Sequence, residues 1–306
     1  MKNESPLVSI IVLTYNSSKY VLETLESAKA QTYPNIELIV SDDCSSDNTV
    51  AICSKWIEEN KECFIRTEML KVGINTGTCS NANRGAKNAN GQWLKFIAGD
   101  DILLSDCISF YVERTIHNTN ICIAASNVKY IDEQSEKIEN YDSELDHLRD
   151  FFSTLSIERQ KKEYARLPFF LNTPTFFLNR EFLSKIDWFD ERFQVYEDMS
   201  LIYKALNMGY RIHIFKKDTV KYRISNNSLS RIKTKDATIK KNKEHIMCFN
   251  IYRRKLLNKW NIVDLSVFFE FWLQYQFKGV FGKKCVSVFN KISFYYWYKK
   301  FIILFN

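Results

Sequence analysis

Apolar runs and amphipathic segments alternate along the first hundred residues. Four runs rich in β-branched and aromatic residues predict strands: 7–14 (LVSIIVLT), 36–43 (IELIVSDD), 64–70 (FIRTEML) and 92–98 (QWLKFIA). Three segments between them space their apolar residues at helical intervals: 20–31, 45–60 and 78–88. Strands that alternate with helices in this way predict a parallel, doubly wound α/β sheet.

The pattern is less regular farther along the chain. Residues 121–132 (ICIAASNVKYID) predict another strand, and the charge-rich stretch 133–166 predicts helices and a mobile loop. Order resumes with a strand and a helix start at 172–183. A helix follows at 198–207, ended by Gly209 and continued by a strand.

Polar side chains gather where three of the predicted strands end. Tyr15 and Asn16 follow the first strand, Asp42 and Asp43 end the second, and the pair 100–101 follows the fourth. Ligands of doubly wound sheets bind beyond the carboxyl ends of the strands. Adjacent carboxylates repel each other, so Asp100 and Asp101 call for a metal ion, a basic side chain or solvent.

Four motifs in fixed order carry a family resemblance. They are VSIIVLTYN, VSDDCSSDNT, NTGTCSNANRGAKNANGQWLKFIAGDD and, about a hundred residues later, YED. Together they resemble the family 2 glycosyltransferases of the GT-A fold, over residues 6–228. The resemblance implies a GT-A (Rossmann-like) catalytic domain at 1–230, followed by a mainly helical region at 231–306. It also implies sugar transfer from a nucleotide diphosphate to a hydroxyl, with inversion and with a divalent metal.

The resemblance assigns roles on the donor side of the site. Asp101 would face Mg²⁺ or Mn²⁺, hard cations that prefer carboxylate oxygens, and Asp100 would lie near the donor ribose or sugar. Asp43 would accept a hydrogen bond from the nucleotide base, with Tyr15 packed beside it and Asn16 in the same cluster. Asp43 can instead cap the helix that follows, and Tyr15 can be an ordinary packing residue. UDP is the expected carrier.

The 75–85 segment would run beneath the donor, with Asn75 and Asn83 as its polar contacts. In the family an arginine often precedes the second asparagine. Here Ala82 takes that place and Arg84 follows it, so phosphate contacts through this segment are not implied.

Inverting transfer also needs a base for the acceptor hydroxyl. The ED motif assigns this role to Asp198, with Glu197 helping to hold the acceptor, although acids at a helix N-terminus are favourable in their own right. Trp188 is a candidate lining residue of the acceptor pocket or a core residue. A basic loop would close over the diphosphate, or lie in solvent, through Arg223, Ser228 and Arg231.

Charge is divided unevenly along the chain. Residues 231–306 carry 16 Lys/Arg against 4 Asp/Glu, whereas the rest carries 27 against 32. The stretch 260–306 adds 16 aromatic residues, in segments too interrupted to span a membrane. Basic, aromatic helices favour the surface of an anionic membrane, with packing on the domain or a homodimer contact as alternatives, and no nucleic-acid motif is present. The expected acceptor is a saccharide or a lipid-linked saccharide of cell-surface polysaccharide.

Other features carry little functional signal. The eight cysteines form no C-x-x-C pair and are expected to be reduced structural thiols. The four histidines lack metal-ligand spacing, and His213 alternates within a strand as a structural residue. The amino-terminal residues are too short and polar for a secretory signal, so we expect the protein in the cytoplasm, with access to the inner face of the membrane.

Rival functions remain open from the residues alone. A dinucleotide-dependent oxidoreductase shares the doubly wound fold, but TYNSSKY after the first strand lacks the glycines of the G-x-G-x-x-G motif. An inactive sugar-nucleotide-binding scaffold at the membrane would keep the same motifs. A nucleotidyltransferase is compatible with the fold. The donor sugar, the acceptor and the linkage cannot be read from the sequence.

Overall fold

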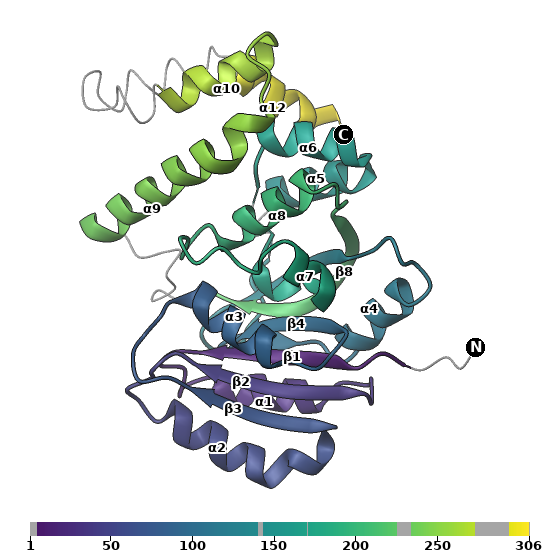
Figure 1. The fold of residues 1–306 in the computed structure, drawn as a ribbon, viewed down its shortest axis with the longest axis vertical. Helices are drawn as coiled ribbons and strands as arrows, with labels where there is room; N and C mark the ends of the chain where they lie inside the picture. The colour runs from purple at the N-terminus through teal and green to yellow at the C-terminus, as the bar shows by residue number, and fades with distance from the viewer. Residues whose placement is uncertain (1–4, 140–142, 170, 225–233, 273–293, 306) are drawn as a thin grey trace.

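A computed structural model describes residues 5–139, 143–169, 171–224, 234–272 and 294–305 of the chain. One mixed sheet has its strands in the order β3-β2-β1-β4-β7-β6-β8-β5. Figure 1 shows its β1–β3 edge in the lower part of the molecule, with α9, α10 and α12 above. The strands are β1 (Val8–Thr14), β2 (Ile36–Asp42), β3 (Arg66–Lys71), β4 (Trp93–Ala98), β5 (Ile102–Leu103), β6 (Ile123–Ile131), β7 (Phe177–Asn179) and β8 (His213–Arg223). The helices are α1 (Val21–Lys29), α2 (Thr49–Asn60), α3 (Thr78–Asn88), α4 (Cys107–Thr115), α5 (Ser143–Thr154), α6 (Ile157–Arg166), α7 (Arg180–Lys185), α8 (Glu197–Asn207), α9 (Lys235–Cys248), α10 (Ile262–Trp272) and α12 (Phe294–Phe305).

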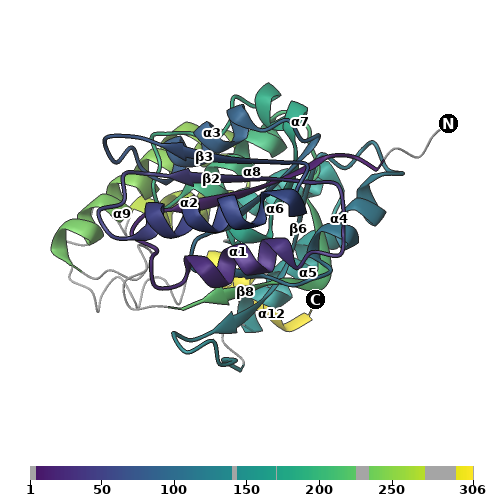
Figure 2. The same cartoon turned by 90° about the horizontal axis from the view of Figure 1, so that it is seen from below.

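The amino-terminal half of the sheet is parallel, as predicted. β1 pairs in parallel with β2 and β4, and β2 pairs in parallel with β3. Successive residues of β1 face opposite cores. Ile10 and Val12 pack in one cluster with residues of α1 and α2, whereas Ile11 packs in another with residues of α3. Figure 2 shows α1 and α2 side by side over their face of the sheet.

The other half of the sheet is mixed, so the parallel pattern predicted from the first hundred residues does not continue there. β7 runs antiparallel to both β4 and β6, and β5 runs antiparallel to β8. The register explains the direction of β7, because its first residue, Phe177, lies opposite Lys95 and its last, Asn179, opposite Trp93. The chain thus enters β7 from the end of the sheet where β4 finishes and runs back along it.

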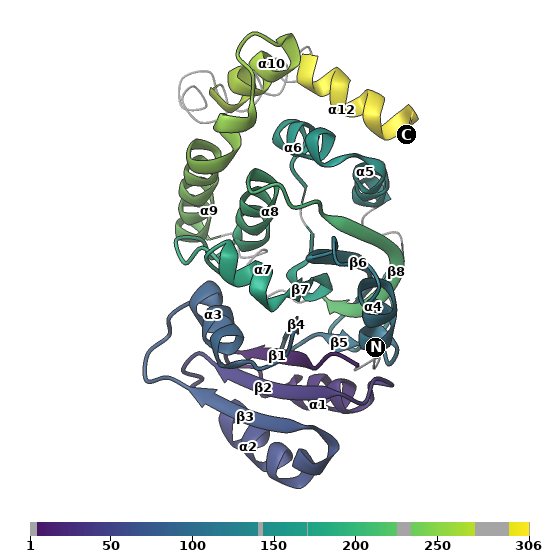
Figure 3. The ribbon, with the colours of Figure 1, turned by 45° about the vertical axis from the view of Figure 1, so that its right-hand side comes forward.

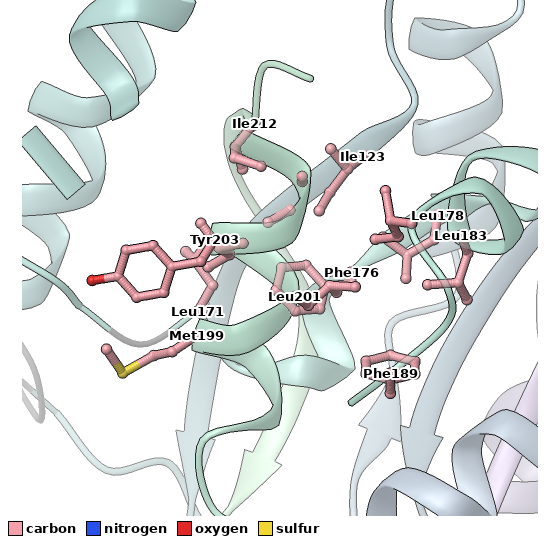
Figure 4. Packing of buried hydrophobic residues seen from close by; sticks show 14 of the residues in the cluster. Ile123, Leu171, Phe176, Leu178, Leu183, Phe189, Met199, Leu201, Tyr203 and Ile212 are labelled. Carbon is pink, nitrogen blue, oxygen red and sulfur yellow. The ribbon is translucent and has the colours of Figure 1, made fainter. Parts of the chain in front are cut away.

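Helix α8 carries the predicted ED motif at its first turn and is anchored by apolar packing. Its residues Met199, Leu201 and Tyr203 belong to one buried cluster with Phe176 and Leu178 of the neighbouring segment (Figure 4). The predicted stop is confirmed. Gly209 has a φ of 86°, and its N–H lies 3.1 Å from the carbonyl oxygen of residue 206.

The carboxy-terminal helices pack on the rest of the molecule. α9, α10 and α12 arch around α6 and α8 (Figure 3). Arg166 of α6 donates from Nε to Asp264 Oδ1 of α10 at 2.6 Å, and Arg253 Nε donates to the carbonyl oxygen of Ala165 at 2.7 Å. Within the described ranges, no helix combines the length and the hydropathy that crossing a membrane requires.

Candidate active site

The loops after β1 and β2 are tied together at the predicted edge of the sheet. Thr14 Oγ1 donates to Asp42 Oδ2 at 2.8 Å, and Asn16 Oδ1 accepts from the backbone N–H of Ser46 at 2.8 Å. Asn16 and Cys44 both have left-handed φ values, of 51° and 68°. An asparagine adopts this conformation more readily than a cysteine, so strain is concentrated beside the second strand end.

Tyr15, on the same loop, has 53% of its surface exposed. An exposed ring is free to stack on a planar ligand, which fits the role that the resemblance implies for this residue.

Asp43 is buried and bound by the loop that precedes α3. Its carboxylate accepts from the N–H of Gly77 at 2.7 Å, from Oγ1 of Thr76 at 2.6 Å and from Nη2 of Arg84 at 3.1 Å. Asn75 Oδ1 accepts from the same Gly77 N–H at 3.1 Å. In this structure Asp43 therefore holds the donor-side loop in place, and reading a nucleotide base would be an added role.

Arg84 is the donor-side residue that sequence reasoning undervalued. Its guanidinium donates to Asp43 and, at 2.7 Å, to Asn81 Oδ1. Asn81 Nδ2 donates to the carbonyl oxygen of Ser41 at 2.9 Å. Residues 81 and 84 are three positions apart on a helix and share one face, and this spacing was the available signal. The positively charged Arg84 guanidinium therefore lies at the end of β2, although Ala82 takes the place of the arginine that is common in the family.

Asn83 does not join the strand-end site. Both protons of its amide are used, by the carbonyl oxygen of Phe189 and by Glu191 Oε1, each at 2.9 Å. Its Oδ1 accepts from the N–H of Phe189 at 2.9 Å. In this structure Asn83 binds the 189–191 segment, because residue 83 lies on a different face of α3 from residues 81 and 84, and its expected donor contact stays a prediction.

The acidic turn after β4, residues 100–101, is hydrogen-bonded to Arg223. Asp101 is 2% exposed, and its Oδ1 accepts from the backbone N–H of Arg223 at 2.8 Å. Burial raises the pKa of Asp101 well above its usual range, and the charge of Asp100 raises it further, while Arg223 opposes the shift. Burial also raises the pKa of Asp100. Ionising both carboxyls is therefore costly without an added cation.

The donor chemistry of this turn suits a hard divalent ion. Among the described residues, Asp101 Oδ2 has no hydrogen-bond partner, which leaves one oxygen of a fixed carboxylate for a metal. Those residues include no cluster of three or more His, Cys, Asp or Glu side chains able to hold a metal. A metal bound here would take most of its ligands from substrate and water, the usual arrangement for Mg²⁺.

Arg223 does not act as a closing loop residue, so that expectation was wrong. It is the last residue of β8 and 1% exposed. Its Nε donates to the carbonyl oxygen of Asp100 at 2.8 Å, and its Nη2 donates to Glu23 Oε2 of α1 at 2.9 Å. The other proposed loop residues, Ser228 and Arg231, lie outside the described residues.

The two carboxylates of the ED motif have different surroundings. Asp198 is 4% exposed, and its Oδ1 accepts from the N–H of Met199 at 2.6 Å. Glu197 Oε1 accepts from Thr173 Oγ1 at 3.4 Å, whereas its buried Oε2 has no partner among the described residues. Burial raises the pKa of Glu197 to about 7, and it raises that of Asp198 well above its usual range.

Tyr222 links the two acidic groups and was missed by sequence reasoning. After burial, the charges of Asp101, Asp100 and Glu197 are the causes that raise its pKa. The acidic turn and the ED motif therefore both contribute to the electrostatic surroundings of one residue, although nearly a hundred positions separate them in the chain. A polar residue at the end of a strand next to a basic residue was the only signal for it.

Trp188 and His213 lie away from these carboxylates. The Lys87 ammonium of α3 lies 5.8 Å from the Trp188 ring centre, and the Trp188 carbonyl oxygen accepts from Lys204 at 2.8 Å. Trp188 also packs against the main buried cluster, which favours its structural reading. His213 is half-buried at the start of β8, and burial lowers its pKa.

A parallel sheet that continues into a mixed one, with an acidic turn after β4, defines a nucleotide-sugar transferase fold of the GT-A class. Residues 9–187 match the family model described as glycosyl transferase family 2. This chain therefore belongs to glycosyl transferase family 2.

Individual relatives agree with this assignment. An uncharacterized glycosyltransferase of Rickettsia prowazekii, RP339, is 38% identical over 117 residues, which are 38% of this chain and 32% of that protein. The putative teichuronic acid biosynthesis glycosyltransferase TuaG of Bacillus subtilis is 24% identical over 78% of this chain and 86% of its own length. The crystal structure of S. aureus TarS 1-349 in complex with UDP-GlcNAc has a TM-score of 0.62 at 18% identity, covering 91% of this chain and 77% of that one. The matched part spans about a third of the length of RP339.

Proposed function

We propose that this protein transfers a sugar from a UDP-sugar to an acceptor hydroxyl, with inversion and with Mg²⁺ or Mn²⁺. The proposed acceptor is a lipid-linked glycan of a bacterial cell-surface polysaccharide. The observation that carries the proposal is the presence of two buried carboxyls, Asp101 after β4 and Asp198 at the start of α8, in a chain whose residues 9–187 match glycosyl transferase family 2. The similarity to TuaG, a putative teichuronic acid biosynthesis glycosyltransferase, supports the polysaccharide, and the similarity to TarS, solved in complex with UDP-GlcNAc, supports the UDP-sugar.

On the donor side, each residue has a definite task. Asp101 presents one oxygen to the metal while Arg223 holds the other, and Tyr15 stacks on the base. Arg84 keeps Asp43 and the loop before α3 in register with the end of β2. A bound divalent ion supplies the positive charge that stabilises the departing diphosphate.

On the acceptor side, the ED pair removes the proton of the attacking hydroxyl. The resemblance implies Asp198 as the base. Glu197 is the second candidate, because its buried Oε2 has no partner among the described residues and its pKa lies near 7. A base whose pKa lies near the working pH combines a useful ionised fraction with a useful affinity for the proton.

The test is calorimetric titration of UDP, GDP and NADH, with and without Mn²⁺, combined with UDP release from a panel of UDP-sugars. We expect Mn²⁺-dependent UDP binding that Asp101→Asn abolishes, and UDP release from at least one donor. Tight UDP binding without turnover of any donor would support an inactive scaffold instead. Binding of NADH alone would overturn the proposal.

A further inference from the structure

Residues 190–196, the segment before the ED motif, are bound by the carboxy-terminal region. Glu244 of α9 is 5% exposed, and its Oε2 accepts from the backbone N–H groups of Gln194 and Val195, at 3.0 and 2.9 Å. Two hydrogen bonds to one buried carboxylate fix the chain two residues before Glu197.

Other contacts of the same region grip the same segment. Tyr252 donates from its hydroxyl to Asp190 Oδ2 at 2.6 Å, and the rings of Tyr196 and His245 stack with centres 5.4 Å apart. Lys240 contacts the Gln194 side chain. The position of residues 190–196 therefore depends on the position of α9 and of the turn after it.

Gln194 of this segment also contacts the donor-side loop. A side-chain carbon placed on Gly77 would meet the Gln194 amide nitrogen at 3.1 Å, so the two residues are packed together. Gly77 is also the residue whose N–H binds Asp43. One segment thus contacts α9 on one side and the donor-side loop on the other.

We propose that Glu244 is a positioning residue for the Glu197–Asp198 pair, and that α9 is a working part of the active site. This inference rests on the proposed function. Glu244 lies on α9 in the carboxy-terminal region, so that region contributes a positioning residue to the site.

Electrostatics gives Glu244 a second effect on the same pair. Burial is the main cause of the raised pKa of Glu197, and the negative charge of Glu244 adds to it. In the described part of the chain, the other titratable groups that interact with Glu197 are Asp198 on its own helix, Cys79 on α3 and Tyr222 on β8. The neighbouring His245 has a pKa lowered to about 4 by burial, so it stays neutral at working pH. Removing the charge of Glu244 lets the pair ionise at lower pH.

Two variants separate the contact from the charge. Glu244→Gln keeps a carbonyl oxygen that can accept both N–H groups but removes the charge, whereas Glu244→Ala removes both. Asp236→Asn is the matched control, because Asp236 lies on the same helix with an exposed side chain. The readouts are UDP release from UDP-GlcNAc, UDP-Glc and UDP-Gal with Mn²⁺ as a function of pH, and hydrogen exchange of peptides covering 190–198.

For Glu244→Ala we expect faster exchange of these peptides and a loss in kcat of about tenfold with little change in KM. For Glu244→Gln we expect near-normal exchange and an acid limb of kcat shifted to lower pH by about half a unit. The control should match the wild type in both readouts.

Unchanged exchange in Glu244→Ala, or an unshifted acid limb in Glu244→Gln, would overturn the inference while leaving sugar transfer intact. If Glu244→Ala fails to fold, the pH profile of Glu244→Gln decides alone. Wild-type protein that releases UDP from none of these donors would overturn the proposed function, and this inference with it.

Discussion

At the scale of single residues, Arg223 shows how a polar core builds a site. Its buried guanidinium joins the acidic turn to α1 and, through Nη1 and Ser135 Oγ at 2.9 Å, to the loop after β6. Its backbone N–H orients Asp101. One side chain thus fixes three elements around the carboxylate proposed to bind the metal.

Replacing Arg223 should therefore damage both folding and metal-dependent binding. We expect Arg223→Ala to lower the free energy of unfolding by about 3 kcal/mol, because several buried hydrogen-bonding groups lose their partner. We expect Arg223→Lys to fold but to bind UDP with Mn²⁺ about tenfold more weakly, since an ammonium cannot reproduce the planar fork. Urea unfolding and calorimetry measure the two effects.

Arg159→Ala, at a largely exposed position on α6, is the control and should leave both quantities unchanged. Wild-type UDP affinity in Arg223→Lys would show that the guanidinium does not orient the acidic turn.

Glu197 should make stability fall as pH rises. Its pKa is about 7 in the folded protein against a reference of 4.5, so the folded state holds the proton more tightly. The stabilisation that the protonated Glu197 carboxyl gives to the folded state is complete below pH 4.5 and is lost as the pH rises to 7. Glu197→Gln removes this loss, so its unfolding temperature should exceed that of the wild type at pH 8 and converge with it near pH 5.

Thermal unfolding across pH 5 to 8 measures the effect. Glu181→Gln is the control, because the Lys185 partner lowers the pKa of that exposed carboxyl and no gain is expected at pH 8. A constant offset between Glu197→Gln and wild type at all pH values would rule out the raised pKa. The variant should also lose activity by about a hundredfold if Glu197 is the base.

At the scale of elements, local pattern decided what the sequence could predict. α3 was expected at 78–88 and has those bounds, because its neighbours on both sides are polar loops. A strand was expected within 172–183, where β7 lies, but its antiparallel direction depends on distant partners, Lys95 and Ala124, which no local pattern specifies. The same limit applies to the site. Asp43, Asp100 and Asp101 follow from strand ends, whereas Arg223, Tyr222 and Glu244 reach it through tertiary packing.

Helix α10 presents an apolar face that suits the membrane-surface association expected from the sequence. Ile262, Leu265, Phe269 and Trp272 are all exposed, and their spacing puts them on one side of the helix. Trp297 and Phe301 of α12 are exposed as well, beside Lys299 and Lys300 in the same helix. Exposed aromatic side chains near lysines favour the interface of an anionic bilayer.

We therefore expect the protein to cosediment with vesicles that contain phosphatidylglycerol and much less with pure phosphatidylcholine. The double change Leu265→Ser and Phe269→Ser should reduce binding by about tenfold or more, at unchanged unfolding temperature. Ile65→Ser, an exposed apolar position near β3, is the matched control. Equal binding of the double variant and the control would exclude this face, and concentration-dependent dimers lost in the double variant would assign it to a second copy.

At the scale of the whole molecule, the carboxy-terminal helices are bound through buried charges rather than through apolar contacts alone. Arg166 and Asp264 are 5% and 2% exposed and lie 2.6 Å apart. Asp264 Oδ2 also accepts from the backbone N–H of Asn258 at 2.8 Å. Breaking a buried pair strands the remaining charge, which costs more than the pair contributes when intact.

We expect Asp264→Ala to destabilise the protein by about 3 kcal/mol and Arg166→Ala by a similar amount, with the double variant well short of their sum. If α9 is part of the active site, loosening α10 should also speed hydrogen exchange at 190–198 before global unfolding. Chemical unfolding of the two single variants and the double variant, with exchange measured on the same samples, tests both. Strictly additive losses would mean that Arg166 and Asp264 do not interact, and unchanged exchange at 190–198 would mean that α10 does not support the position of α9.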